Sequence, residues 1–311
     1  MKDVSILLVN YKTPLMTINC VQSIINHTYS IKYEIIIIDN GSNDNSIELF
    51  QENYCENNDV IIVDAKSNLG FGKANNLGAT FASGKYLFLL NNDTVLLDNA
   101  VKSFYNFMED KKNSNIAVCG GNLLDSEKKP THSYNELPNI RFERQSAYKF
   151  IARRLKRNRA RNDFNFTDKI IEVGYITGAD LFIRTTIFQE INGFDQDFFM
   201  YSEESEMCYR IKKCGYKIVN IPYINIIHLE GQSVKSSLDY NPKRFEMFCE
   251  GRYLYYYKVY GIKTMKKLNK ILKNSFILKY ILSFFNKKYL NMLKIVKITY
   301  KNTINKIGGS K

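Results

Sequence analysis

The acidic cluster Glu203, Glu204 and Glu206 closely follows the largely aromatic segment 198–201. Crowded carboxylates in an aromatic setting repel one another, which raises their pKa values toward the range that suits a general base. Acids are also favoured in the first turn of a helix, because the helix begins with a partial positive charge. The cluster alone therefore fits a helix start as well as a catalytic base, and the helix start is the simpler interpretation.

The segment Asn91-Asn92-Asp93 directly follows the apolar residues 86–90. A carboxylate at the end of a buried strand is well placed to hold a cation that bridges two phosphates, since Mg²⁺ and Mn²⁺ prefer oxygen ligands. An Asx turn explains the same three residues equally well. His228 follows the apolar residues 224–227 and is a second candidate metal ligand, although a histidine there is more often hydrogen-bonded structure.

Several other chemistries lack their sequence signatures. Gly70-Phe71-Gly72 has no third glycine at the spacing of a dinucleotide fingerprint, and Gly84-Lys85 lacks the earlier glycine of a phosphate-binding loop. None of the six cysteines forms a C-x-x-C pair, so a zinc cluster is not expected and the thiols are predicted to be reduced and buried. We interpret residues 70–72 as a turn at which a ligand can approach the backbone.

Strand-length apolar runs alternate with segments of helical periodicity in the first third of the chain. The expected strands are 4–9, 34–38, 60–63 and 86–90, and the expected helices are 17–27, 46–54 and 75–83. This alternation predicts a mostly parallel sheet with helices on both faces, in which ligands bind at the carboxyl ends of the strands. Further on, strands are expected at 218–221 and 224–227 around Pro222, with helices from residue 244.

The positive charge of the chain is concentrated at its end. Residues 261–311 contain 13 lysines and no arginine or acid, whereas the preceding 260 residues carry 31 basic and 31 acidic side chains. A basic tail on a neutral body predicts an anionic partner, either a membrane or a nucleic acid. No apolar stretch has the length of a spanning helix, and no signal peptide is expected at the N-terminus.

The ordered motifs together resemble the inverting family 2 glycosyltransferases of the GT-A fold, and most closely the bacterial rhamnosyltransferase-like members. The resemblance covers about residues 3–260. It rests on Val4 to Tyr11, Ile37-Ile38-Asp39-Asn40-Gly41-Ser42, Asn68-Leu69-Gly70-Phe71-Gly72, Leu89-Leu90-Asn91-Asn92-Asp93, Gly178-Ala179, Gly193-Phe194-Asp195, Phe198-Phe199-Met200-Tyr201, Glu203-Glu204, Gly215-Tyr216, Pro222 and His228.

The resemblance implies a role for each matching residue. Asp39 contacts the donor nucleoside, and the asparagines Asn10, Asn68, Asn91 and Asn92 line the same pocket. Asp93 holds Mg²⁺ or Mn²⁺, with His228 as a second metal contact. Glu203 and Glu204 match the acidic pair whose second member is the base. That member is usually Asp, and Glu206 also replaces a usual Asp, so Glu204 is the expected base, Glu203 is the runner-up, and a weakened enzyme is a further interpretation.

The resemblance also implies an α/β fold of the nucleotide-diphospho-sugar transferase type, Rossmann-like, with a C-terminal helical extension. We expect a transferase domain over 1–260, with a donor-binding half at 1–120 and a catalytic half at 170–260, and a basic amphipathic tail over 261–311. The expected donor is dTDP-rhamnose or a UDP-sugar. The expected acceptor is a polyprenyl-diphosphate-linked saccharide of a cell-surface polysaccharide such as O-antigen or capsule. The expected location is cytoplasmic, peripheral on the inner face of the cell membrane.

Two other hypotheses stay open. One is a catalytically weak glycosyltransferase-like scaffold, which the glutamates at 204 and 206 suggest. The other is a nucleic-acid-binding protein that uses the basic tail, although the neutral body and the lack of a recognition motif count against it, and no nucleic-acid partner is expected.

Overall fold

The computed structural model describes residues 2–154, 163–229 and 240–308. They form two compact units. The first comprises Met1–Glu136, Asn162–Gln196 and Met207–Lys235, and the second comprises Leu137–Arg161, Asp197–Glu206 and Ser236–Lys311. Residue 260, where the tail was expected to begin, lies inside the second unit, so residues 261–311 share that unit with segments from much earlier in the chain.

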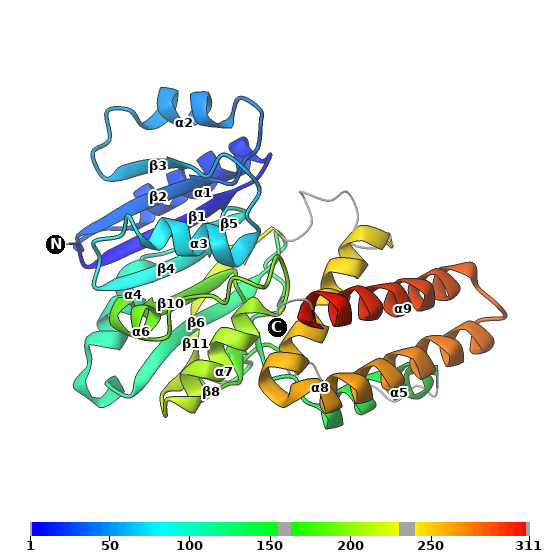
Figure 1. The fold of residues 1–311 in the computed structure, drawn as a ribbon. Helices are drawn as coiled ribbons and strands as arrows, with labels where there is room; N and C mark the ends of the chain where they lie inside the picture. The colour runs from blue at the N-terminus through cyan, green and yellow to red at the C-terminus, as the bar shows by residue number, and fades with distance from the viewer. Residues whose placement is uncertain (1, 155–162, 230–239, 309–311) are drawn as a thin grey trace. The chain divides into compact units, whose positions relative to one another are not determined.

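The first unit is built on a nine-stranded sheet among the described residues, in the order β3-β2-β1-β4-β10-β6-β11-β5 with β8 paired to β11 (Figure 1). Its strands β1, β2, β3, β4, β6 and β11 are parallel, and β5, β8 and β10 run against them. The strands are β1 (Val4–Asn10), β2 (Tyr33–Asp39), β3 (Val60–Asp64), β4 (Tyr86–Asn91), β5 (Thr94–Leu96), β6 (Ile116–Leu124), β8 (Ile171–Glu172), β10 (Asp180–Arg184) and β11 (Lys217–His228). A separate pair consists of β7 (Tyr134–Asn135) and β9 (Tyr175–Ile176).

Helices cover both faces of this sheet. Ile6 and Leu8 of β1 pack in one core with side chains of α1, whereas Leu7 between them points to the other face and contacts Gly78 of α3. The helices of the first unit are α1 (Pro14–His27), α2 (Ser46–Tyr54), α3 (Phe71–Ala79), α4 (Ala100–Glu109), the 3₁₀ turn η1 (Lys111–Asn113), α6 (Thr185–Glu190) and most of α7 (Glu203–Lys213). The predicted mostly parallel α/β fold is confirmed.

Three predicted elements have different bounds in the structure. Helix α3 begins at Phe71 instead of residue 75, because Gly70 turns the chain with a φ of 82° and the helix follows at once. Helix α1 begins at Pro14, since proline fits the first helical position. The two strands expected around Pro222 are one strand, β11, whose register against β6 shifts between Asn220 and Asn225 because proline has no N–H to donate.

The second unit is helical. It contains α5 (Ile140–Arg154), the first turn of α7, α8 (Pro242–Leu282) and α9 (Lys287–Gly308). Helix α8 bends at Gly261, whose φ of 78° is not helical, and α9 then returns beside α8 as a hairpin (Figure 1). Its core consists of Phe198, Cys249, Tyr253, Leu254, Tyr255, Tyr256, Met265, Leu268, Leu272, Phe276, Leu293 and Val296.

The unit also contains a buried ion pair. Glu143 of α5 pairs with Arg252 of α8 and accepts a hydrogen bond from the hydroxyl of Tyr256 at 3.1 Å. These contacts fasten α5 to α8. Of the helices that the structure describes, none combines the length and the apolar character that crossing a membrane requires.

Candidate active site

The carboxyl ends of β1, β2 and β4 bring together most of the predicted donor-binding residues. The parallel register places Asn10 opposite Asp39, and Val9 opposite Asn91. Because these strands end at the same edge of the sheet, residues about 30 and 80 positions apart in the sequence become neighbours. This edge is where open α/β sheets bind their ligands.

Asp39 is the centre of a buried hydrogen-bond network at this edge. Its Oδ1 accepts from the Asn10 side chain at 2.7 Å and from the Ser42 hydroxyl at 2.5 Å, and its Oδ2 accepts from the Ser42 N–H at 3.0 Å. Asn10 is fully buried, and its own Oδ1 accepts from Thr17 at 2.9 Å. Asn10 therefore holds Asp39 in place, while Asp39 shapes the turn after β2.

The same turn is fastened to the loop that precedes α3. Asn40 accepts from the Leu69 N–H at 2.8 Å and donates to Asn68 at 3.2 Å, and Asn68 accepts from the Gly70 N–H at 3.0 Å. Asn68 itself is exposed. The predicted turn at Gly70 is confirmed, and Gly72 lies in the first turn of α3.

Asn92 is held by two threonines that sequence reasoning missed, one just before α1 and one in its first turn. Its side-chain N–H groups donate to Thr13 and Thr17, both at 2.8 Å. The hydroxyl of Thr94 closes the turn by donating to the Asn91 carbonyl at 2.8 Å. The segment is thus a hydrogen-bonded turn, as one interpretation predicted, and the turn orients Asp93. The threonines carried no sequence signal, because they contact Asn92 only across the fold.

Asp93 and His228 lie side by side although 135 positions separate them in the chain. The short strand β5 pairs with β11 so that His228 is opposite Thr94, and the Leu229 N–H donates to the Asp93 carbonyl at 2.9 Å. His228 Nε2 then lies 3.1 Å from Asp93 Oδ1 and 3.3 Å from Asn91 Nδ2.

This pair fits a hard divalent cation as two of its ligands, one carboxylate oxygen and one imidazole nitrogen. Within the described ranges, no group of three His, Cys, Asp or Glu side chains converges as a metal site. Further ligands of a cation at Asp93 would be amide or carbonyl oxygens, phosphate oxygens or water. The six cysteines are free, and Cys20, Cys119, Cys208 and Cys249 are buried, whereas Cys55 and Cys214 are exposed, contrary to the prediction that all are buried.

The acidic pair lies in the second unit, at the start of α7. The helix-start interpretation is confirmed, because Glu203 and Glu204 are the first two residues of the helix, and the catalytic base stays a prediction. Glu203 is 4% exposed and Glu204 is half-buried. Burial raises the pKa of both carboxyls, and the negative charge of Glu204 raises the pKa of Glu203 further. Within the described structure, Oε2 of Glu203 has no hydrogen-bond partner.

A sharp turn held by α8 positions this pair. Tyr201 and Ser202, which precede Glu203, have φ values of 70° and 71°, a conformation that is rare for residues with side chains. The Tyr201 hydroxyl accepts from Arg244 Nε at 2.8 Å, and a Cβ on Gly251 would overlap the Tyr201 carbonyl. Sequence reasoning missed Gly251, since a glycine inside a helix does not reveal which distant backbone approaches it.

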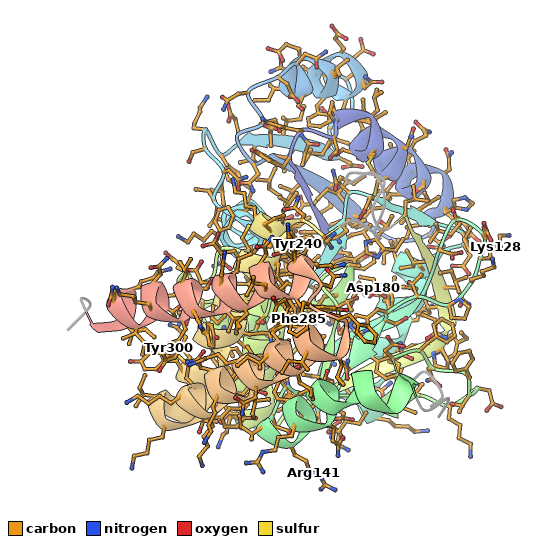
Figure 2. The ribbon with its side chains drawn as sticks, turned by 90° about the vertical axis from the view of Figure 1, so that its right-hand side faces the viewer. Lys128, Arg141, Asp180, Tyr240, Phe285 and Tyr300 are labelled. Atoms are coloured by element: carbon orange, nitrogen blue, oxygen red, sulfur yellow. The ribbon has the colours of Figure 1, made fainter. Side chains whose placement is uncertain are left out.

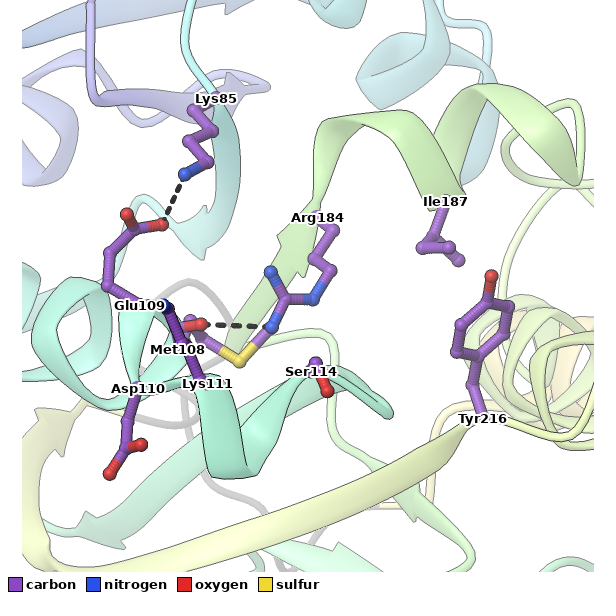
Figure 3. Close-up of a pocket in the computed structure, with 9 residues that line it drawn as sticks. All are labelled: Lys85, Met108, Glu109, Asp110, Lys111, Ser114, Arg184, Ile187 and Tyr216. Atoms are coloured by element: carbon purple, nitrogen blue, oxygen red, sulfur yellow. Dashed lines mark hydrogen bonds and ion pairs between the residues drawn. The ribbon is translucent and has the colours of Figure 1, made fainter.

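A separate cavity of about 360 Å³ lies at the opposite edge of the sheet, near the start of β4 and the end of β10 (Figure 3). Three of its charged residues are already bound to neighbouring groups. Lys85 pairs with Glu109 at 2.6 Å, and Arg184 donates to the carbonyls of Ile116 and Met108. These contacts tie strands to helix α4, so the cavity is part of the scaffold and not the site at the strand ends.

Comparison with known proteins agrees with this fold. The sequence profile described as "Glycosyl transferase family 2" matches residues 5–171, more than half of the chain, so the chain belongs to this family. Rhamnosyltransferase WbbL of Escherichia coli (strain K12) is 23% identical over 205 residues, 63% of this chain and 72% of WbbL. The low-salt glycan biosynthesis hexosyltransferase Agl10 of Haloferax volcanii is 25% identical over 230 residues, 73% of this chain and 67% of Agl10.

A solved structure shares the fold. The crystal structure of GalNAc-T7 with UDP, GalNAc and Mn²⁺ superposes with a TM-score of 0.57 and 17% identity. The match covers 81% of this chain and 47% of that one. The predicted membership of family 2 and the predicted GT-A fold are therefore confirmed, and the chain is a glycosyltransferase by family.

Proposed function

We propose that this protein transfers a sugar, with rhamnose favoured, from a nucleoside-diphosphate donor to a saccharide acceptor with inversion at the anomeric carbon. The observation that carries the proposal is the convergence of Asp39, Asp93 and His228 at the carboxyl ends of the sheet strands in a family 2 domain. The rhamnosyltransferase WbbL supports rhamnose as the sugar. The donor is then dTDP-rhamnose or a UDP-sugar.

Each part of the site has a role in this reaction. Asp39 and Asn68 contact the nucleoside, and Asn10 keeps the Asp39 carboxylate oriented. Asp93 and His228 hold Mg²⁺ or Mn²⁺, which when bound neutralises charge on the departing nucleoside diphosphate. Glu204 removes the proton of the acceptor hydroxyl as that oxygen attacks the anomeric carbon, and its raised pKa suits this work near neutral pH. A single in-line displacement inverts the anomeric centre, so no covalent intermediate on the protein is required.

The acceptor in this proposal is linked to a polyprenyl diphosphate, and the protein works on the inner face of the cell membrane. The support is electrostatic: residues 261–311 contain 13 lysines and no acid, and such a segment is attracted to anionic lipid. The basic residues of 141–161 are a second candidate contact for a lipid diphosphate, although part of this segment lies outside the described residues.

The test is the thermal unfolding of the full chain with a panel of nucleotide sugars, each with Mn²⁺, Mg²⁺ or EDTA. A ligand that binds only the folded protein stabilises it, by about 2.7 kcal/mol at 100 times its Kd. We expect one donor to raise the unfolding temperature only when the metal is present. Asp93→Ala should abolish this shift, whereas Asp168→Ala, which removes an exposed carboxylate elsewhere in the first unit, should keep it.

The scaffold hypothesis makes the opposite prediction. It is motivated by Glu204 and Glu206, which replace aspartates that the resemblance leads us to expect. If no nucleotide sugar shifts the unfolding temperature under any metal condition, the transferase proposal fails and the scaffold is favoured. If a donor binds but no transfer follows, the donor half is intact and the acidic pair is the defective part.

A further inference from the structure

The turn between α8 and α9 exposes large apolar side chains, whereas the apolar stripes of both helices are buried. From the sequence, residues 261–311 were expected to form a basic amphipathic tail on the inner face of the cell membrane. Instead Met265 and Leu268 of α8 and Val296 of α9 pack in the core of the second unit. The apolar side chains left outside at this end of the hairpin are Ile277, Ile281, Phe284 and Phe285, with 41%, 53%, 85% and 64% exposure. We call these four residues the hairpin tip.

The backbone of the hairpin tip is fixed in an uncommon shape. Phe284 and Phe285 have φ values of 53° and 65°, a region that glycine and asparagine adopt more readily than bulky residues. The Phe285 N–H donates to the Tyr280 carbonyl at 2.9 Å, and the two rings pack edge to face at 5.2 Å. The turn is therefore closed by its own contacts and holds Phe284 outward. Phe285 is labelled in Figure 2.

Exposed lysines follow the hairpin tip directly on α9, whereas those of α8 lie 7 to 14 residues before Ile277. Lys287 and Lys288 begin α9 directly after the turn and are exposed. On α8 the exposed lysines precede the tip, at Lys263, Lys266, Lys267 and Lys270. At 1.5 Å per helical residue, Ile277 lies roughly 8 Å from the end of α8 at Leu282, within the depth of about 5–10 Å that interfacial helices reach. The apolar side chains of the tip can therefore reach the acyl boundary of a bilayer, and the neighbouring lysines can pair with its anionic headgroups.

We propose that the hairpin tip, with Lys287 and Lys288, docks into an anionic phospholipid bilayer. This inference deepens the proposed membrane association, but it requires neither donor nor acceptor, so it can fail while the transferase proposal holds. A second copy of the chain is a poorer occupant, because it would bring its own 13 lysines against these. A nucleic acid would pair with the lysines but would leave the exposed apolar side chains of the tip without a partner.

The chain contains no tryptophan, which allows a direct test of depth. We would place a single tryptophan by Ile281→Trp or by Ile298→Trp, two exposed isoleucines of the same hairpin at 53% and 56% exposure. With vesicles of phosphatidylcholine and phosphatidylglycerol, the Ile281→Trp emission should shift to the blue and be quenched by brominated lipid. Ile298→Trp, 11 residues into α9, should show neither effect. Equal responses at both positions, or none at residue 281, would overturn the proposal.

Paired substitutions test separately how the apolar and the charged side chains of the hairpin tip contribute to vesicle binding. Phe284→Asn with Phe285→Asn keeps residues that tolerate a positive φ, so the hairpin should fold while vesicle binding falls at least about tenfold. Lys287→Glu with Lys288→Glu should also weaken binding, whereas Lys111→Glu with Lys112→Glu, an exposed lysine pair of the first unit, should weaken it less for the same charge change. Unchanged vesicle sedimentation in the phenylalanine variant refutes the proposal, as does a dimer that this variant dissociates.

Discussion

Glu203 and Glu204 are adjacent in the chain, but their environments suit different roles. Glu204 is half-buried and so keeps a surface that an acceptor hydroxyl can reach, whereas Glu203 is 4% exposed. The N–H groups of residues 204 and 205 lower the pKa of Glu204 in part, against the larger effect of burial. We therefore expect the accessible member, Glu204, to be the base, at the position that the family resemblance indicates.

We expect Glu204→Gln to lower kcat by about 10²–10⁴, the usual contribution of a general base, because the amide cannot accept the acceptor proton. Donor binding should persist, measured as the metal-dependent thermal shift. Glu204→Asp restores a carboxylate and should recover part of the rate. Transfer at the full rate in Glu204→Gln would rule out this residue and leave Glu203 as the candidate.

Glu203 gives a prediction about stability instead. Its pKa is raised in the folded state, so its contribution to stability is fully present below the pKa of the unfolded chain and is lost as the pH rises through the folded pKa. At pH 8 the unfolded chain has ionised this carboxyl, so the folded state must either keep the proton or hold a buried charge with an unpartnered oxygen, and both cost free energy. Glu203→Gln should raise the unfolding temperature at pH 8 more than at pH 4, whereas an equal change at both would contradict the burial of an ionisable group here.

At the scale of elements, helix α8 supports the acidic pair through Gly251. A methyl group at this position would meet the Tyr201 carbonyl and push the 201–202 turn, and with it the start of α7. We expect Gly251→Ala to destabilise the protein by about 1–3 kcal/mol, as overpacking does, and to lower kcat while the donor-induced thermal shift is kept. Gly308→Ala, where no atom lies within 4 Å of the added carbon, is the control. Equal kinetics in the two variants would show that Gly251 does not position the pair.

The elements also show how far the sequence could predict the site. The family resemblance placed Asp39 and Asn10 in one pocket, and they meet because each ends a strand of the same parallel pair. The contact between Asp93 and His228 depends on the pairing of β5 with β11. The three residues of β5 are too few to show a periodicity, so the sequence did not predict this strand. The same limit applied to residues 261–311. Their helical spacing predicted an apolar face, but only the structure shows that α8 and α9 cover each other's stripes.

At the scale of the whole molecule, the uneven distribution of charge assigns attraction to lipid and donor binding to different parts of the chain. Residues 1–260 carry equal numbers of acids and bases, and the positive excess lies beyond them. Attraction to anionic lipid therefore acts on the helical hairpin, and added salt should weaken vesicle binding because exposed charges are screened over about 10 Å at 0.1 M. The donor site at the strand ends requires no such attraction.

This separation predicts that the hairpin tip affects transfer only when the acceptor is in a membrane. Phe284→Asn with Phe285→Asn should transfer sugar to a water-soluble acceptor at the unaltered rate. Transfer to a polyprenyl-diphosphate-linked acceptor in phosphatidylglycerol vesicles should fall, because the protein loses the high local concentration that docking provides. Dispersing the same acceptor in detergent should bring the two proteins back to similar rates. A loss on the soluble acceptor as well would mean that the substitutions disturb the site itself, whereas equal rates on vesicles would mean that the tip does not dock during catalysis.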